Sequence, residues 1–182
     1  MYEIRLHGLG GEGVVRLSEM IGMAAMENGQ WAHSFPFYGT EVRGAAVKAF
    51  ARVDEKPITI KSYIYEPDVI VLLNDGLIDH PDVRAGIKPD TLFLINKECN
   101  VEALEKDLGC KVYAIGATNM ALKLFGRPIT NTIMLGGIAA ITGLFEPLVL
   151  EKVIRDNFSE KIAESNIEAM RLGYQSLKEE SA

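Results

Sequence analysis

Six residues near the amino terminus have the spacing of a phosphate-binding turn. The run Gly8-Leu9-Gly10-Gly11-Glu12-Gly13 satisfies the pattern Gly-x-Gly-x-x-Gly and lies between a strand-like and a helix-like segment. Backbone amides without a neighbouring Cβ can approach a phosphate closely, and a helix amino terminus adds partial positive charge. The run therefore predicts an anion-binding turn, and a glycine turn needed only for tight packing is the alternative interpretation.

The loop after the second predicted strand combines aromatic residues with opposite charges. It reads Phe35-Pro36-Phe37-Tyr38-Gly39-Thr40-Glu41-Val42-Arg43-Gly44. Because this loop and the glycine turn both follow the carboxyl ends of strands, we expect them at one edge of the sheet, where open α/β folds bind ligands. Glu41 and Arg43 can pair with each other or bind a ligand, and the aromatic residues favour an interaction surface.

Two function classes other than a subunit of a larger enzyme stay open. A nicotinamide dehydrogenase would need an acid at the end of the second strand, where the chain reads His33-Ser34-Phe35-Pro36. Glu41 follows only after a proline and a glycine, so a free-standing NAD(P)-dependent reductase is the second interpretation. A binding or scaffold module is the third.

The sequence contains no complete catalytic set. Cys99 and Cys110 are too few for a four-thiolate iron–sulfur cluster, and they form no Cys-x-x-Cys pair. His7, His33 and His80 are isolated, which favours structural or surface histidines over metal ligands. The serine elbow of esterases and the P-loop are also missing. We therefore expect no catalytic residue and no metal site, as in one part of a larger enzyme.

Length and composition predict one domain over residues 1–182. The 19 Lys and Arg residues against 25 Asp and Glu give a formal net charge of −6, which disfavours nucleic-acid binding. The amino terminus lacks the pattern of a secretory signal. The apolar stretch 133–145 is short and interrupted by glycines, so it predicts a buried helix and not a membrane span. We expect a cytoplasmic protein without membrane partners.

The elements that must position these residues alternate between strand-like and helix-like patterns. The predicted strands are residues 2–7, 30–35, 46–53, 58–62, 68–73, 91–96 and 111–115. Asp54-Glu55-Lys56-Pro57 predicts a β-hairpin, and Pro36 is expected to end the second strand. Helices are predicted from Val14 to Gly29, over 101–108, 119–125 and 133–144, after Pro147, and at the carboxyl terminus.

The predicted fold class is α/β. It is a Rossmann-like open mixed, mostly parallel sheet with flanking helices, one β-hairpin insertion and a helical C-terminal third. In the last helix an apolar seam is expected to dock on the sheet of its own chain, with a partner chain as the alternative. The seam consists of Ala163, Ile167, Met170, Tyr174 and Leu177.

Four motifs occur together in this order along nearly the whole chain. They are Gly8-x-Gly10-Gly11-x-Gly13, Phe35-Pro36-x-x-Gly39-x-Glu41-x-Arg43-Gly44-Ala45, Ile64-Tyr65-Glu66-Pro67-Asp68 and Gly126-Arg127-Pro128-Ile129-x-Asn131-Thr132-x-Met134-Leu135-Gly136. In these motifs the chain resembles the gamma subunit of 2-oxoacid:ferredoxin oxidoreductases, most of all that of the pyruvate enzyme. Glu12 departs from the family, which usually has glutamine there, and it adds negative charge beside the predicted anion site.

The resemblance implies an oxidative decarboxylation, in which pyruvate and coenzyme A become acetyl-CoA and carbon dioxide while ferredoxin is reduced. It implies that thiamine diphosphate and the [4Fe–4S] clusters belong to other subunits, named alpha, beta and delta. It leaves 2-oxoglutarate and branched-chain 2-oxoacids open as substrates. This chain would help to form the region through which coenzyme A reaches the active site.

The candidate binding residues follow from the resemblance and the glycine turn together. They are Gly8, Gly10, Gly11, Gly13, Gly39, Glu41, Arg43, Gly44 and Asn131. Among them, Arg43 is the best candidate for a charge-assisted contact with phosphate or carboxylate.

Overall fold

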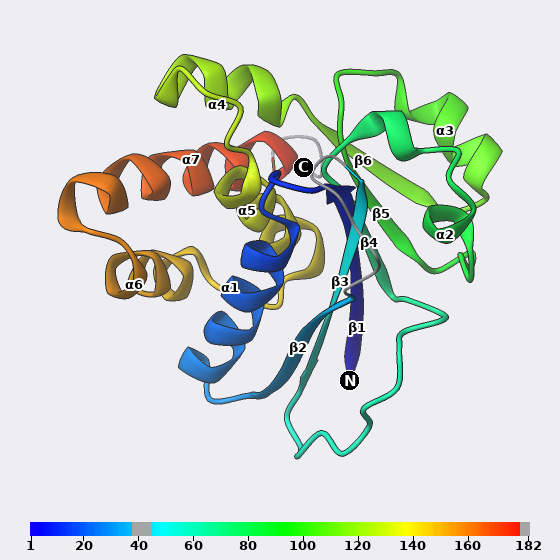
Figure 1. Cartoon of the computed structure of the whole chain (residues 1–182), viewed down its shortest axis with the longest axis horizontal. Helices are drawn as coiled ribbons and strands as arrows, with labels where there is room; N and C mark the ends of the chain where they lie inside the picture. The colour runs from blue at the N-terminus through cyan, green and yellow to red at the C-terminus, as the bar shows by residue number, and fades with distance from the viewer. Residues whose placement is uncertain (38–44, 179–182) are drawn as a thin grey trace.

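In the computed structural model, which describes residues 1–37 and 45–178, six strands form one mixed sheet (Figure 1). The sheet has the order β2-β3-β1-β4-β5-β6. Its strands are β1 (Tyr2–Leu9), β2 (Trp31–Phe37), β3 (Ala46–Asp54), β4 (Val69–Leu72), β5 (Leu92–Asn96) and β6 (Lys111–Ile115). Strands β1, β4, β5 and β6 are parallel, whereas β3 runs antiparallel between β1 and β2. The predicted α/β class with a mixed, mostly parallel sheet is confirmed.

The two faces of the sheet carry different layers (Figure 1). One face is covered by the helices α1 (Val14–Glu27), α4 (Ala117–Phe125), α5 (Asn131–Thr142), α6 (Pro147–Asn157) and α7 (Glu160–Lys178). The other face carries the short helices η1 (Asp75–Leu77), α2 (Pro81–Arg84) and α3 (Val101–Leu108). No helix in residues 1–37 and 45–178 is long and apolar enough to cross a membrane.

Alternation along β1 separates an apolar side from a polar one. Ile4 and Leu6 lie in the core beneath α1 and α5. Arg5 and His7 point to the opposite face, where they are buried near α2. Arg5 and His7 are therefore enclosed on the face of the sheet that carries the short helices η1, α2 and α3.

The helical C-terminal third is confirmed, and its apolar seam packs within the chain, mainly against α5 and not directly on the sheet, with Tyr174 partly buried and the other seam residues buried. The two helix backbones touch where they cross. A Cβ built at Gly136 would lie 2.0 Å from the carbonyl oxygen of Met170, and one at Gly173 would lie 2.0 Å from that of Ile133. Glycine is therefore required at both crossing positions.

The predicted β-hairpin is wrong, because residues 58–62 do not form a strand. Arg52 of β3 explains the difference: its guanidinium donates to the carbonyl oxygens of Ile60 (3.3 Å), Ser62 (2.8 Å) and Tyr63 (3.4 Å). These carbonyls would otherwise accept ladder hydrogen bonds from a neighbouring strand. Strand β3 pairs instead with β1 and β2.

The prediction that Pro36 ends the second strand is also wrong. Strand β2 continues through Pro36 to Phe37, with Pro36 opposite Ala49 of β3. Within the described sheet β2 is an edge strand, where a proline removes no ladder donor that a second neighbour needs.

Candidate functional site

The glycine turn joins β1 to α1, as predicted. Gly8 belongs to β1, and Gly10 and Gly11 lie in the turn. Gly13 is the N-cap residue of α1, with a φ of 83° in the left-handed region that favours glycine. A Cβ at Gly13 would lie 3.1 Å from Nδ2 of Asn131, the first residue of α5. The structure therefore brings the turn and Asn131 together.

Glu12 places a carboxylate inside this turn. The Leu9 amide donates to its Oε2 at 2.6 Å, and Nδ2 of Asn74 donates to its Oε1 at 2.6 Å. The carboxylate thus occupies a backbone amide that an anion could otherwise use, and its charge repels a second anion. This arrangement weakens the prediction that the turn itself binds phosphate.

The predicted loop residues Gly39, Glu41, Arg43 and Gly44 lie outside the described residues. Of the ends that flank them, Ala45 lies directly against the glycine turn, because its carbonyl oxygen accepts from the Gly10 amide at 2.9 Å. For this end of the loop, the predicted common edge with the turn is confirmed.

A cavity of about 270 Å³ opens at the same edge, on the sheet face opposite to α1. Strands β1, β2 and β3 and the region of α2 contribute its polar and aromatic lining. These residues are His7, Phe37, Lys48, His80 and Asp82. The remaining lining is apolar and consists of Ala45, Ala46, Val47, Leu77 and Val83.

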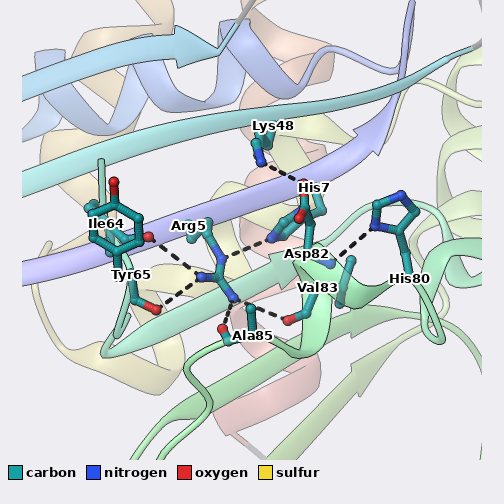
Figure 2. Close-up of polar contacts among 9 residues, drawn as sticks. All are labelled: Arg5, His7, Lys48, Ile64, Tyr65, His80, Asp82, Val83 and Ala85. Carbon is teal, nitrogen blue, oxygen red and sulfur yellow. Dashed lines mark hydrogen bonds and ion pairs between the residues drawn. The ribbon is translucent and has the colours of Figure 1, made fainter. Parts of the chain in front are cut away.

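Arg5 lies buried behind this cavity, and all five of its N–H groups donate hydrogen bonds (Figure 2). Its Nε donates to Nε2 of His7 at 3.0 Å. The other four donate to the carbonyl oxygens of Ile64, Tyr65, Val83 and Ala85. Burial lowers the pKa of Arg5 to about 10, so the guanidinium remains charged at neutral pH.

His7 is held as a neutral ring. Burial and then the charges of Arg5 and Lys48 lower the pKa of His7 to about 3. Because Nε2 accepts from Arg5, the proton of the neutral ring is assigned to Nδ1. No hydrogen bond joins Nδ1 to any residue in the described parts of the chain. His7 therefore offers the cavity one N–H donor.

Lys48 and Asp82 complete the polar lining. Lys48 Nζ lies 2.5 Å from Oδ2 of Asp82 and 4.4 Å from the ring centre of Phe37. The hydrogen bond from Lys48 lowers the pKa of Asp82, so that carboxyl is ionised at neutral pH. His80 accepts through Nδ1 from the Asp82 amide at 3.2 Å, which assigns its proton to Nε2. The set can bind a polar group, and it contains no activated nucleophile.

Sequence reasoning missed most of this cluster. Arg5, Lys48 and Asp82 were not predicted as site residues, and His7 and His80 were interpreted as isolated. The available signal was the pair Arg5 and His7 at positions i and i+2, alternating with the apolar Ile4 and Leu6, which places both side chains on one face.

The described residues contain no group of three or more His, Cys, Asp or Glu that could hold a metal ion. Cys99 and Cys110 are free thiols. Burial raises the pKa of Cys110 to about 11, so this thiol is protonated at neutral pH and is a poor metal ligand or nucleophile.

Known proteins match this chain over almost its whole length. The family described as pyruvate ferredoxin/flavodoxin oxidoreductase matches residues 3–176. Pyruvate synthase subunit PorC of Methanothermobacter thermautotrophicus is 43% identical over 178 residues, which cover 98% of this chain and 97% of the relative. The pyruvate/ketoisovalerate oxidoreductases common subunit gamma of Pyrococcus furiosus is 43% identical, with 96% of each chain covered.

Solved structures share the fold. The crystal structure of pyruvate oxidoreductase subunit PORC from Thermotoga maritima has a TM-score of 0.85 at 32% identity, covering 96% of this chain and 95% of that chain. A 2-oxoglutarate:ferredoxin oxidoreductase from Magnetococcus marinus, solved with 2-oxoglutarate, coenzyme A and succinyl-CoA bound, has a TM-score of 0.81 at 22% identity. It is matched over 98% of this chain but only 31% of that chain, so the same fold also occurs within a longer polypeptide.

Proposed function

Because the chain belongs to the pyruvate ferredoxin/flavodoxin oxidoreductase family, as the gamma subunit of a pyruvate/2-oxoacid:ferredoxin oxidoreductase, we propose that it serves the coenzyme A-dependent oxidation of pyruvate. In that reaction pyruvate and coenzyme A become acetyl-CoA and carbon dioxide, and the electrons reduce ferredoxin. Thiamine diphosphate supplies the decarboxylation and [4Fe–4S] clusters carry the electrons, and both are bound by the alpha, beta and delta subunits. The names of the relatives, which are pyruvate synthase subunits, support this substrate.

The chain's own part is to shape the region through which coenzyme A reaches the active site. The observation that carries this proposal is a convergence at one edge of the sheet. The glycine turn, Asn131, Ala45 and the cavity beside His7 meet there. Binding groups without an activated nucleophile suit a subunit that positions a substrate for chemistry on neighbouring chains.

Within that region we assign the contact with the coenzyme A phosphates to Arg43. The carboxylate of Glu12 opposes an anion at the glycine turn, so a guanidinium is the better partner for phosphate. In this proposal the glycine turn supports the loop by backbone contact, and the hydrogen bond from the Gly10 amide to the carbonyl oxygen of Ala45, which follows the loop, is consistent with that role.

Arg43→Ala in the assembled enzyme tests this role. A charge-assisted hydrogen bond contributes about 1.5–3 kcal/mol, so we expect the KM for coenzyme A to rise about 10- to 100-fold while the KM for pyruvate stays unchanged. The measurement is pyruvate-dependent dye reduction by enzyme purified anaerobically through a tag on this chain. Arg171→Ala, which removes an exposed arginine of α7, is the matched control.

The outcomes separate the parts of the proposal. Loss of the other subunits from Arg43→Ala would assign the residue to assembly. An unchanged KM for coenzyme A in an intact complex would remove Arg43 from both roles. If the tagged natural chain brings down no thiamine enzyme at all, the assignment to pyruvate oxidation fails.

A further inference from the structure

The cavity beside His7 is backed by the buried positive charge of Arg5, which shares the nearby carboxylate of Asp82 with Lys48. Arg5 donates only to carbonyl oxygens and to the ring of His7, and within residues 1–37 and 45–178 it forms no ion pair. A buried cation that forms no direct ion pair raises the electrostatic potential of the accessible space around it. Two accessible spaces adjoin this cation: a pocket of about 140 Å³ that Arg5 lines together with Lys48 and Asp82, and the larger cavity, which His7 separates from Arg5.

Three residues that line this cavity carry hydrogen-bond donors, and Figure 2 shows their side chains. Nδ1 of His7 comes from β1, Nζ of Lys48 from β3, and Nε2 of His80 from the residue that caps α2. Among the described lining residues the carboxylate is that of Asp82, and it binds Lys48 at 2.5 Å. Arg5 and Lys48 thus place two cations against this one carboxylate.

We propose that this cavity is an anion subsite for a carboxylate or a phosphate group, with Lys48 Nζ and His7 Nδ1 as donors and Arg5 as the charge behind them. In the structure the carboxylate of Asp82 takes the place of this anion on Lys48. The Asp82 side chain is 51% exposed, so it can turn into solvent when an external anion takes its place on Lys48. The ring of Phe37 keeps the Lys48 ammonium at the cavity during this exchange.

This subsite goes beyond the role proposed for Arg43 and does not depend on it. The same chemistry would recognise a phosphate group of coenzyme A, free inorganic phosphate or a small carboxylate such as a 2-oxoacid. The residues proposed for this subsite, Arg5, His7, Lys48 and Asp82, are described residues outside the glycine turn, and Arg43 is not one of them. The two proposals can therefore fail separately.

Nuclear magnetic resonance of the histidine rings in the full-length chain provides the test. Inorganic phosphate, acetate and coenzyme A are titrated in turn, and we expect a saturable shift of the His7 ring signals. Lys48→Met should weaken phosphate binding about tenfold or more, because it removes a charge-assisted donor. Asp82→Asn should tighten it several-fold, because it removes the internal competitor without changing the shape of the side chain.

Lys88→Met is the matched control, because Lys88 pairs with Asp68 at the opposite end of the parallel strands. It should leave phosphate binding unchanged, and far-UV circular dichroism verifies that each variant is folded. Opposite effects of Lys48→Met and Asp82→Asn support the exchange. Equal affinities in both variants, or no shift of His7 with any of the three anions, would overturn the subsite.

The three titrations also identify the source of the anion. Saturation by coenzyme A at lower concentration than by phosphate or acetate supports a coenzyme phosphate. Saturation by phosphate or acetate alone supports a free small anion. The two proposals can also give different results. If phosphate shifts the His7 signals but Arg43→Ala leaves the KM for coenzyme A unchanged, this subsite stands and the role assigned to Arg43 fails.

Discussion

A single neutral histidine links the cavity to the pH dependence of stability. In the unfolded chain His7 titrates near pH 6.5, whereas in the folded protein its pKa is lowered to about 3, first by burial. Below about pH 6.5 the unfolded chain therefore binds a proton that the folded chain does not bind. This difference favours unfolding increasingly as the pH falls from about 6.5 towards 3.

His7→Gln should remove that part of the pH dependence. For one proton, the free energy of unfolding of the natural chain falls by about 1.4 kcal/mol per pH unit well below pH 6.5. The variant keeps a side chain that can accept from Arg5 but does not titrate, so its slope near pH 5 should be smaller by one proton. Urea unfolding at several pH values measures both slopes. Above about pH 7 the two proteins should show parallel curves, and equal slopes near pH 5 would contradict the assignment.

At the scale of residues, local patterns were predictable and distant partners were not. The glycine turn could be placed because a short motif needs only its own spacing and the elements on either side. Gly13 and Asn131 were both predicted as candidate binding residues, but only the structure showed that they lie side by side. The environment of His7 depends on Lys48 and Asp82, which come from a strand and a short helix far along the chain. No spacing within β1 could indicate them.

At the scale of elements, two buried arginines hold an irregular segment against the sheet at a place where no helix covers it. The segment between β3 and β4 crosses this face without forming a helix or strand over residues 58–62. Arg52, which is 1% exposed, and Arg5 both donate to its carbonyl oxygens, and Arg52 also pairs with Glu3 at 2.7 Å. Such carbonyls need partners once they are withdrawn from water. The arginines therefore fix the path of the segment.

Arg52→Met should loosen that segment and destabilise the protein. The variant leaves several carbonyl groups and the Glu3 carboxylate without their partner, and we expect a loss of about 2–4 kcal/mol in the free energy of unfolding. Trypsin should also cleave faster after Lys61, which lies between two of these carbonyls. Arg171→Met, at an exposed ion pair of α7, should change stability by less than about 1 kcal/mol. Equal cleavage and stability in both variants would show that the contacts of Arg52 do not hold the segment.

The wrong hairpin has the same physical cause. Residues 46–53 and 58–62 are both strand-like and are separated by turn-forming residues, so the local pattern favours pairing. Only the first run forms a strand, because the side chain of Arg52 takes the carbonyls of the second. Pattern reasoning counts which side chains are apolar, and it contains no information on where an arginine from a neighbouring strand will donate.

At the scale of the molecule, the sheet is shared by two apolar cores. The larger lies beneath α1 and α5, and the smaller lies beneath α2 and α3. Neighbouring residues of β4 alternate between them, with Val71 in the first and Ile70 in the second. Both cores use the same sheet, so unfolding of the sheet would expose both of them to water. We therefore propose that residues 1–182 unfold as one domain.

Unfolding by urea tests this cooperativity through two probes. Trp31, the single tryptophan, lies at the start of the edge strand β2 and is 53% exposed, so its fluorescence reports on one border of the sheet. Far-UV circular dichroism is dominated by the helices, which lie mainly beyond β6 in the sequence. We expect both signals to change at the same urea concentration. Separate midpoints would show that the sheet border and the helical third unfold independently.

The crossing of α5 and α7 connects the carboxyl-terminal part of the chain to its amino-terminal turn. With Gly136 against Met170 and Gly173 against Ile133, the two helix axes cannot come nearer or rotate without a clash of main-chain atoms. The first residue of α5 is Asn131, which abuts Gly13. The position of α7 therefore fixes the position of α5, and the start of α5 contacts the turn between β1 and α1. A substitution that shifts α7 should consequently also shift this amino-terminal turn.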